Sequence, residues 1–532
     1  MADAAFRAPP PGVISRSLTR LVARQSDTGF GLAATAACDP DPAAPPTLEI
    51  ELYAEDIMTP AAALAAALTV AILEGRDAIG GTWDLFRYPG IRSDSDMYTL
   101  GYSFRPWTSP KAIADGPAIL AYLNETARAY GIDRKIRFGH SVKRAAWSSQ
   151  TARWTVDVER GETREPVQLS CSFLFMCSGY YDYELGYTPD FPGAERFAGQ
   201  IVHPQQWSDD VEYKGKRVVV IGSGATAVTL VPNLAKTAAH VTMLQRSPTY
   251  IVSMPDEDAL ANWLRRRLPA KLAYALTRWK NVVLGMLLYQ FCQRAPERAK
   301  RLILRGVRNA LGPDFDVERH FSPAYKPWDQ RLCLVPNGDL FEAIKQKRVS
   351  IVTDGIERFT ETGIRLASGV ELPADLIVTA TGLRMKFLGG LELSVDGARV
   401  ECPETLTYKG MMLEGVPNLA MAVGYTNASW TLKCDLTCEY VCRLLNHMEK
   451  HGHAQCRPER GDADVPLEPF IGLTSGYIQR ARHLFPKQGA KRPWKLYQNY
   501  ALDLLALGYG RLEDGVMRFS RAVPAVEERE VA

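Results

Sequence analysis

Short apolar runs that end at small or charged residues form the first pattern in this chain. One run covers Arg217–Ile221 and ends at Gly222, a second covers His240–Gln245, and a third covers residues 69–74 and ends at an acid. Apolar runs of about four to eight residues between turn signals are typical of strands buried on both faces. The glycine after the first run also indicates that a helix follows, so the pattern predicts an α/β chain.

Alternating apolar and polar residues elsewhere predict an antiparallel meander. Residues 135–142 and 153–159 have the pattern of its strands, and the chain returns through residues 173–179. A helix is expected over residues 431–447. Two pairs of small residues, Ser178-Gly179 and Thr381-Gly382, mark the strand ends at which the chain is expected to cross between two domains.

The glycine-rich turn after Ile221 predicts a nucleotide site. Glycines at a strand-to-helix turn let backbone amides approach a pyrophosphate closely, and the helix N-terminus favours its negative charge. Arg246 follows the next strand, where an NAD site would have an acid. A cation there suits a 2′-phosphate, so NADPH is favoured over NADH. The residues of this predicted site are Gly222, Ser223, Gly224, Ala225, Thr226, Ala227, Gln245 and Arg246.

The segment before this turn carries the most specific motif in the sequence. The motif is F-x-G-x-x-x-H-x-x-x-W, and its positions are filled by Phe197, Gly199, His203 and Trp207. It resembles the fingerprint of the Baeyer–Villiger monooxygenases, a family of flavoproteins, although Ser208 stands where the family usually has Pro or Asp. The resemblance extends over about residues 70–492, includes residues 80–94 and 375–382, and is closest to the mycobacterial ethionamide-activating branch.

The resemblance implies an α/β fold with two Rossmann-like dinucleotide-binding domains, one for FAD and one for NADPH, and a helical insert. The Pro- and Ala-rich composition of residues 1–45 predicts a poorly ordered leader. The expected boundaries are 46–179 for the first part of the FAD-binding domain, 180–373 for the NADPH-binding domain with its insert at about 258–312, 374–515 for the second part of the FAD-binding domain, and 516–532 for a tail.

The first nucleotide turn departs from the family pattern. Glu74 ends the strand over residues 69–74, where an acid serves the ribose of the FAD adenosine. Counting back about 20 to 25 residues places the expected glycine turn at residues 49–54, where the chain has Glu-Ile-Glu-Leu-Tyr-Ala. Carboxylates there would repel a pyrophosphate. Two explanations stay open: a replaced or frame-shifted N-terminal segment, or a variant that binds flavin in another way. We favour the first, because the resemblance begins abruptly near residue 69.

The resemblance also implies roles for individual residues. It places along the flavin Thr82, Trp83, Asp84, Leu85, Arg92 and Ser93, of which the last two also approach the nicotinamide nucleotide. It implies that Val142 is a backbone contact for the adenine, that Arg331 is catalytic and that Asp94 orients it. Gln330 stands where most members have a lysine that holds the nucleotide phosphate. From the sequence alone, Val142 fits a core valine equally well, and Asp94 and Arg331 fit surface residues.

Composition narrows the classes of protein that remain. A chain of 532 residues is too long for one core and suggests two or three domains, and a net charge of +3 implies no nucleic-acid partner. Ten cysteines without a C-x-x-C pair favour a reducing cytoplasm over a disulfide framework or a zinc site, and Cys434, Cys438 and Cys442 fit small buried hydrophobes. We expect no metal site, no transmembrane helix and no signal peptide.

Residues 258–312 differ from the rest because basic residues alternate there with Leu, Trp and Tyr. One interpretation is a basic amphipathic helical pair that touches a membrane surface, which would make a cytoplasmic protein peripheral to the membrane. The other is a helical insert that lines the substrate cleft and has a solvated basic face. The sequence favours the second interpretation.

These features predict an enzyme, an NADPH-dependent flavoprotein monooxygenase of the Baeyer–Villiger type. It would insert one oxygen atom from O₂ next to a ketone carbonyl to give an ester or lactone, and would oxidise sulfides and thioamides as a side activity. Arg331 suits this reaction because it stays protonated, whereas His203 is expected to be structural or gating. Two alternatives remain: an N- or S-oxygenating flavin monooxygenase, against which Trp207 argues, and a flavin-deficient inactive homologue.

Overall fold

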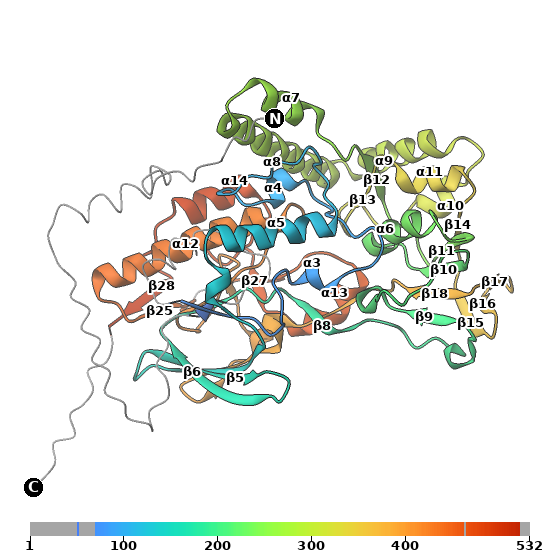
Figure 1. Ribbon diagram of the computed structural model, residues 1–532. Coiled ribbons are helices and arrows are strands. Elements are labelled where there is room, and N and C mark those ends of the chain that lie inside the picture. The colour runs from blue at the N-terminus through green and yellow to red at the C-terminus, as the bar shows by residue number, and fades with distance from the viewer. Residues whose placement is uncertain (1–50, 53–69, 462–463, 522–532) are drawn as a thin grey trace, which may run out of the picture. The chain divides into compact units, whose positions relative to one another are not determined.

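The computed structural model describes residues 51–52, 70–461 and 464–521 (Figure 1). The chain divides into two units, residues 1–45 and 46–532, and all of the described residues belong to the second. The predicted leader lies outside the described residues, as do residues 53–69. Of the segment in which the first glycine turn was expected, only Glu51 and Leu52 are described.

The first parallel sheet has the strand order β24-β7-β1-β2-β3. Its central strand pairs with β2 on one side and β7 on the other, in parallel register. The strands are short, and their bounds are β1 Glu51–Leu52, β2 Ala71–Leu73, β3 Ile136–Arg137, β7 Leu174–Met176 and β24 Leu419–Met421. The segment that replaces the expected glycine turn therefore still supplies the central strand of a dinucleotide-binding sheet.

The second parallel sheet has the order β14-β11-β10-β18-β9. Its strands are β9 Gln200–Val202, β10 Arg217–Ile221, β11 His240–Gln245, β14 Val349–Thr353 and β18 Leu376–Thr379. The two apolar runs that predicted strands in this region are confirmed as β10 and β11. Val218, Val219, Val220 and Ile221 are buried, as expected for a central parallel strand covered on both faces. The predicted α/β fold class is confirmed.

The chain crosses between the two sheets twice, through β8 (Tyr181–Gly186) and β19 (Leu383–Met385), which pair antiparallel. Gly179 and Gly382 precede these strands with φ of 64° and 112°, so both crossings turn at glycine as the sequence suggested. The boundary expected between residues 373 and 374 is wrong, because β18 pairs with β10 and so belongs to the second sheet. The run Leu376–Thr379 is wholly buried, which a central position in that sheet explains.

A mostly antiparallel layer lies between β3 and β7 in the sequence. It contains β4 (His140–Ser148), β5 (Arg153–Arg160) and β6 (Glu165–Cys171), extended by β20 (Glu392–Val395) and β21 (Ala398–Arg399). The predicted meander is confirmed, but the strand expected over residues 135–142 is interrupted at Gly139, which has φ of 66°. Trp147 and Trp154 face each other across β4 and β5 and are almost completely buried.

Helices connect and follow the strands of the two sheets and are labelled in Figure 1. The region expected to be helical contains α7 (Ala259–Arg267), α8 (Ala270–Arg294) and α9 (Pro296–Leu311). The helix expected over residues 431–447 is α12, which covers Trp430–His451. The other helices are α3 Thr82–Leu85, α4 Met97–Leu100, α5 Gly116–Ala129, α6 Ala225–Leu234, α10 Val317–Phe321, α11 Asp339–Lys345, α13 Gly476–Ala481 and α14 Tyr500–Asp503.

Short strand pairs complete the described chain. They are β12 Ile251–Met254 with β13 Cys333–Pro336, β15 Ile356–Thr360 with β16 Gly363–Leu366 and β17 Glu371–Pro373, β22 Thr407–Tyr408 with β23 Met412–Leu413, β25 Gln455–Pro458 with β28 Met517–Ser520, and β26 Leu467–Pro469 with β27 Lys487–Gly489. The prediction of a tail from residue 516 onward is therefore wrong for its first residues, because Met517 is buried and β28 pairs with β25.

Candidate active site

A cavity of about 280 Å³ opens where segments of both domains meet. Its wall combines the segment after β2 with the start of α6 and the segment just before β13. The crevice beyond the carboxyl ends of the strands, where the chain changes direction, is the usual ligand position in open parallel sheets. Residues of the described helical region 259–311 do not line this cavity, so the interpretation of that region as a cleft wall is not supported.

An arginine and an aspartate pair on the cavity wall. Arg331 Nε lies 3.0 Å from Asp94 Oδ2, and Arg331 Nη2 donates to Asp94 Oδ1 over 3.1 Å. A two-point contact of this kind fixes the plane of the guanidinium as well as its position. The two side chains are 32% and 41% exposed, and both line the cavity. The structure thus brings together the two residues predicted as catalytic, which lie 237 positions apart.

The surroundings of Arg331 keep it charged. Burial lowers its pKa, but the Asp94 carboxylate and the nearby phenols of Tyr180, Tyr477 and Tyr181 outweigh this effect and raise the pKa above its usual value. Burial raises the pKa of Tyr180 and, more strongly, that of Tyr181, so both phenols stay neutral near pH 7. The arrangement is a fixed cation beside neutral hydroxyls on the cavity wall, which can stabilise negative charge on a substrate oxygen.

Arg92 supplies a second cation at the cavity. Its Nη1 donates to Asp339 Oδ2 over 2.6 Å, whereas its Nη2 is buried and has no hydrogen-bond partner among the described residues. A buried donor without a partner is costly unless a ligand accepts a hydrogen bond from it. Ser93 also lines the cavity, and its Oγ accepts a hydrogen bond from the backbone amide of Ala114, which holds the loop in place.

The four residues predicted to lie along the flavin, 82–85, form two pairs with different surroundings. Thr82 and Trp83 line the cavity, and the Thr82 hydroxyl shares a hydrogen bond of 3.1 Å with Tyr183. Asp84 and Leu85 are not among the lining residues. The buried Asp84 carboxylate instead pairs with Arg76 and Arg87, which ties the start of the segment to the turn after β2. Gly80 and Gly81, with φ of 128° and 48°, make the sharp turn that admits this segment.

The predicted adenine and ribose contacts lie together, away from the cavity. Glu74 follows β2, is buried, and accepts from the backbone of Arg76 over 2.9 Å. Burial raises its pKa, partly offset by Arg76. The backbone amide of His140 donates to the Glu74 carbonyl, so β4, which carries Val142, starts beside the end of β2. Their neighbouring positions match one extended nucleotide, and their roles stay predictions.

The glycine turn of the second sheet has the geometry of a phosphate site. Gly222 has φ of 136°, and a Cβ there would lie 2.3 Å from the Ala380 carbonyl oxygen. Gly224 caps the N-terminus of α6, and a Cβ on it would meet nothing within 4 Å, which leaves space for a ligand. Ala225 and Thr226 line the cavity, whereas Ser223 donates to the Ser247 carbonyl and Ala227 is buried beneath the helix.

The two residues predicted to select NADPH differ in their surroundings. Gln245 is buried, and its Nε2 donates to the His320 carbonyl and to Thr353 Oγ1 over 2.8 and 2.9 Å. These two hydrogen bonds hold the Gln245 carboxamide against α10 and β14. Arg246, next to it, is exposed. Arg246 is therefore the stronger candidate for a nucleotide phosphate.

The fingerprint residues lie at the crossing between the sheets. His203 Nε2 contacts the Gly382 carbonyl over 3.1 Å, its Nδ1 accepts from the amide of Gln205, and burial lowers its pKa. Its ring packs directly against Gly186, because a Cβ on Gly186 would lie only 2.0 Å from the His203 ring. The ring thus joins β8 to the return strand. Phe197 and Trp207 pack in the cores on either side, next to Phe359 and Tyr213 respectively.

The described residues fit both nucleotides. On the FAD side, the cavity-lining Arg92 has an unpaired buried guanidinium nitrogen, and a positive-φ turn precedes the lining residue Thr82; on the NADPH side, the start of a glycine-capped helix lines the cavity. Sequence reasoning missed the three tyrosines around Arg331, because no motif connects positions 180, 181 and 477. It also missed a cluster of His447, His451 and His453, because only cysteines were considered as metal ligands.

Comparison with known proteins places the chain among related sequences and folds. Residues 110–281 match the family FMO-like, flavin-binding monooxygenase-like. The chain is 56% identical over 452 residues to the FAD-containing monooxygenase EthA of Mycobacterium tuberculosis H37Rv, which covers 85% of this chain and 92% of the relative. It is 50% identical over 459 residues to the putative FAD-containing monooxygenase MymA of the same strain, with 85% and 92% covered.

A solved structure has the same fold at low sequence identity. An oxidized steroid monooxygenase bound to NADP matches with a TM-score of 0.70 at 22% identity, over 90% of this chain and all of that one. The described arrangement of two parallel sheets joined by paired crossing strands is therefore a known architecture.

Proposed function

This chain belongs to the family of FAD-containing monooxygenases, and from that premise we propose that it is a Baeyer–Villiger monooxygenase that uses FAD and NADPH. It inserts one oxygen atom from O₂ next to a ketone carbonyl and releases an ester or lactone. The observation that carries the proposal is the two-point contact between Arg331 and Asp94 on a cavity wall shared by both nucleotide domains.

The residues that would hold the two nucleotides come from two separate segments. Thr82, Trp83 and Arg92, whose Nη2 is unpaired, would serve FAD, and the glycine turn at Gly222 with Arg246 would serve NADPH. Bound FAD supplies the redox chemistry, namely acceptance of a hydride from NADPH and activation of O₂. The protein contributes position and electrostatics.

Arg331 stabilises the negative charge that develops on the substrate oxygen during insertion. The raised pKa keeps it protonated throughout the physiological range, so it needs no proton transfer to do so. Asp94 acts through Arg331, because its two contacts hold the guanidinium plane toward the cavity. A preoriented cation of this kind acts most strongly in a site from which water is excluded.

The rest of the cavity favours apolar substrates. Its wall includes Met97, Leu100, Tyr102, Ile119, Tyr122 and Leu123, and most of these side chains are buried. Aromatic and aliphatic side chains at this density suit aromatic or long-chain ketones. Sulfides and thioamides of similar shape are expected as substrates of a side activity.

Two alternative functions differ from this proposal in ways that can be tested. The fingerprint Trp207 argues against a mainly N- or S-oxygenating enzyme. The other alternative is an inactive homologue without flavin, and measuring the flavin content of the protein distinguishes it.

The test of the assigned chemistry separates NADPH oxidation from product formation. We expect Arg331→Ala to oxidise NADPH at nearly the normal rate and to release hydrogen peroxide, while ester formation falls about 10²- to 10³-fold. Asp94→Asn, which keeps the side-chain volume, should show a smaller loss of the same kind. A normal ester yield from Arg331→Ala would contradict the role given to this residue.

We also propose that the helical region α7–α9 rests on an anionic membrane surface. Along α8, apolar side chains at helical spacing are exposed, with Leu284 and Leu287 56% and 60% accessible. The further members of this apolar stripe are Leu272, Leu276, Trp279, Val283, Leu288 and Phe291. Basic residues flank it, and Glu297 is the only acid in residues 259–311. In the described chain no helix is long and apolar enough to cross a bilayer, so the contact would be peripheral.

Vesicle sedimentation tests this surface. Wild-type protein should bind vesicles that contain anionic phospholipid and bind neutral vesicles more weakly, because basic side chains add attraction near an anionic surface. Leu284→Asp with Leu287→Asp should weaken binding at least about tenfold. Leu467→Asp is the matched control, since Leu467 is similarly exposed on β26. A dimer that the double variant dissociates, with no vesicle binding, would show that a second copy covers the stripe instead.

A further inference from the structure

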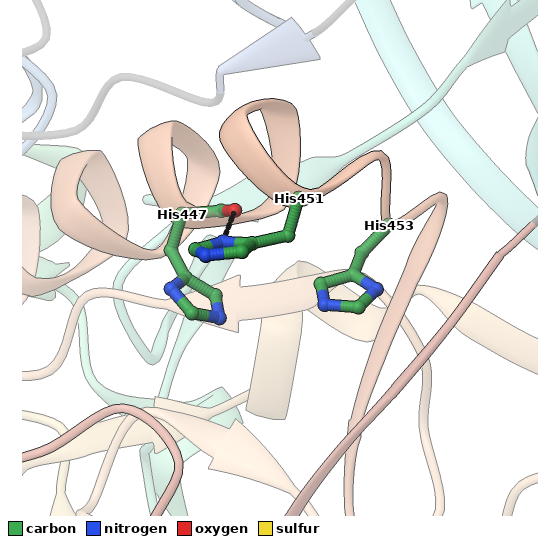
Figure 2. A group of neighbouring side chains, drawn as sticks. All are labelled: His447, His451 and His453. Carbon is green, nitrogen blue, oxygen red and sulfur yellow. Dashed lines mark hydrogen bonds between the residues drawn. The ribbon is translucent and has the colours of Figure 1, made fainter.

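Three histidines gather at the C-terminal end of α12, outside the cavity. His447 and His451 are one helical turn apart, and His453 follows Gly452, whose φ of 65° ends the helix and folds the chain back. One ring nitrogen from each histidine lies within 4.8 Å of those of the other two. Figure 2 shows the three rings side by side, below the end of the helix.

The hydrogen bonds of these rings leave nitrogens free to ligate. His451 Nδ1 is bonded to the His447 carbonyl oxygen over 2.8 Å, the dashed contact in Figure 2. Because the carbonyl only accepts, Nδ1 carries the proton and Nε2 keeps its lone pair. Such a bond from the second ring nitrogen to a backbone carbonyl orients metal-binding histidines in many sites. His453 Nδ1 is buried and has no hydrogen-bond partner among the described residues, and the buried His447 Nε2 lies beside the Glu513 carboxylate.

Neighbouring side chains hold the rings in place and add a fourth ligand group. Phe519 of β28 packs against His447 and His453, with ring centroids 4.9 and 5.2 Å apart. Glu513 Oε1 lies 3.2 Å from His447 Nε2. Two ligands of a tetrahedral zinc ion are about 3.3 to 3.4 Å apart when the bonds are about 2.0 to 2.1 Å long. The Glu513 distance already fits, and the histidine nitrogens need side-chain movements of about an ångström.

We propose that His447, His451, His453 and Glu513 bind one divalent transition-metal ion of the Zn²⁺ class. Imidazole with a single carboxylate is a donor set that Zn²⁺ accepts in tetrahedral geometry. The ion joins the end of α12 to the segment that leads into β28. It therefore stabilises the C-terminal strand pair β25–β28, which closes the described chain.

Calorimetric titration with Zn²⁺ tests this site in the full-length protein without an affinity tag, after chelator treatment and dialysis. Wild type should bind one equivalent saturably. His451→Asn with His453→Asn should weaken binding at least about 100-fold, and Glu513→Gln should weaken it less. His483→Asn is the matched control, because His483 is an exposed histidine outside the cluster. It should bind like wild type.

A structural readout accompanies the titration. Zn²⁺ should slow amide hydrogen exchange in β25 and β28 of wild type and leave it unchanged in the double histidine variant. Absence of saturable binding to wild type would overturn the proposal. Equal binding by wild type and the double variant would also overturn it, because the metal would then be held elsewhere.

Discussion

The two nucleotide-binding halves of this molecule are both built on a five-stranded parallel sheet but differ at the end of the central strand. In the second half, β10 has five residues and runs into a glycine turn that caps α6. In the first half, β1 has two described residues, and the sequence at 49–54 contains two glutamates where glycines are expected. After β2, the chain has the positive-φ turn at Gly80 and the cavity-lining residues Thr82 and Trp83, as the resemblance implied.

The difference shows that strand pairing and phosphate binding place separate demands on a sequence. A parallel sheet needs a short extended segment with apolar neighbours, and almost any such segment can pair between β2 and β7. A pyrophosphate needs close approach of the backbone, which only glycine permits. A segment can therefore complete the first sheet without supplying the flavin phosphate site, and the two halves have to be tested separately.

The largest effect is expected from breaking the intact half. Gly222→Val should abolish tight NADPH binding, with a loss of at least roughly 100-fold, about 3 kcal/mol. The first carbon of the new side chain would overlap the Ala380 carbonyl oxygen, and φ of 136° is strained for valine. Fluorescence titration with NADPH measures the loss, and Gly215→Ala is a control at an open positive-φ position. Unchanged affinity would mean that this turn does not bind the nucleotide.

An intermediate effect should come from the residue that selects between the two nicotinamide nucleotides. Arg246→Glu should raise the KM for NADPH about 10- to 100-fold, because a charge-assisted contact to the 2′-phosphate is lost. The KM for NADH should change far less. Steady-state NADPH and NADH oxidation gives both values. An equal rise for both nucleotides would contradict a contact with the 2′-phosphate.

The smallest effect concerns the crossing that joins the halves. Burial lowers the pKa of His203, so the unfolded state binds a proton more readily than the folded state below about pH 6.5. Stability from this residue is therefore present above that pH and is lost as the pH falls toward the lower folded pKa. His203→Gln keeps a donor toward the Gly382 carbonyl and removes the titration. Denaturant unfolding at pH 7.5 and 5.5 should show a smaller stability loss for the variant than for wild type.

The sequence allowed much of the second half to be predicted, because its signals are local. The apolar runs at β10 and β11, the glycine turn and the fingerprint each lie within a few residues of one another. The pairing of Asp94 with Arg331 was expected only from the resemblance to a family, since no local pattern connects them. The tyrosines around Arg331 escaped prediction because Tyr477 meets the other two only after the chain has folded. The histidine cluster is local in the sequence and was missed because only cysteines were considered as metal ligands.

Two expected boundaries, the domain boundary after residue 373 and the start of the tail at residue 516, disagree with the strand pairing for a related physical reason. The segment Leu376–Thr379 lies directly before the return crossing, and only its partners show that it belongs to the second sheet. The strand Met517–Ser520 has a weak apolar alternation, and its pairing with β25 gives it structure. In both cases tertiary contacts decide what the local sequence leaves open.

The most direct test of the whole account is the absorbance spectrum of the purified full-length protein before and after anaerobic addition of NADPH. The account predicts flavin bands that bleach on addition of NADPH, because FAD is held in the first half and NADPH in the second, facing one cavity. A colourless protein whose flavin bands do not return when FAD is added would contradict it. That result would mean that the segment before β2 does not support flavin binding.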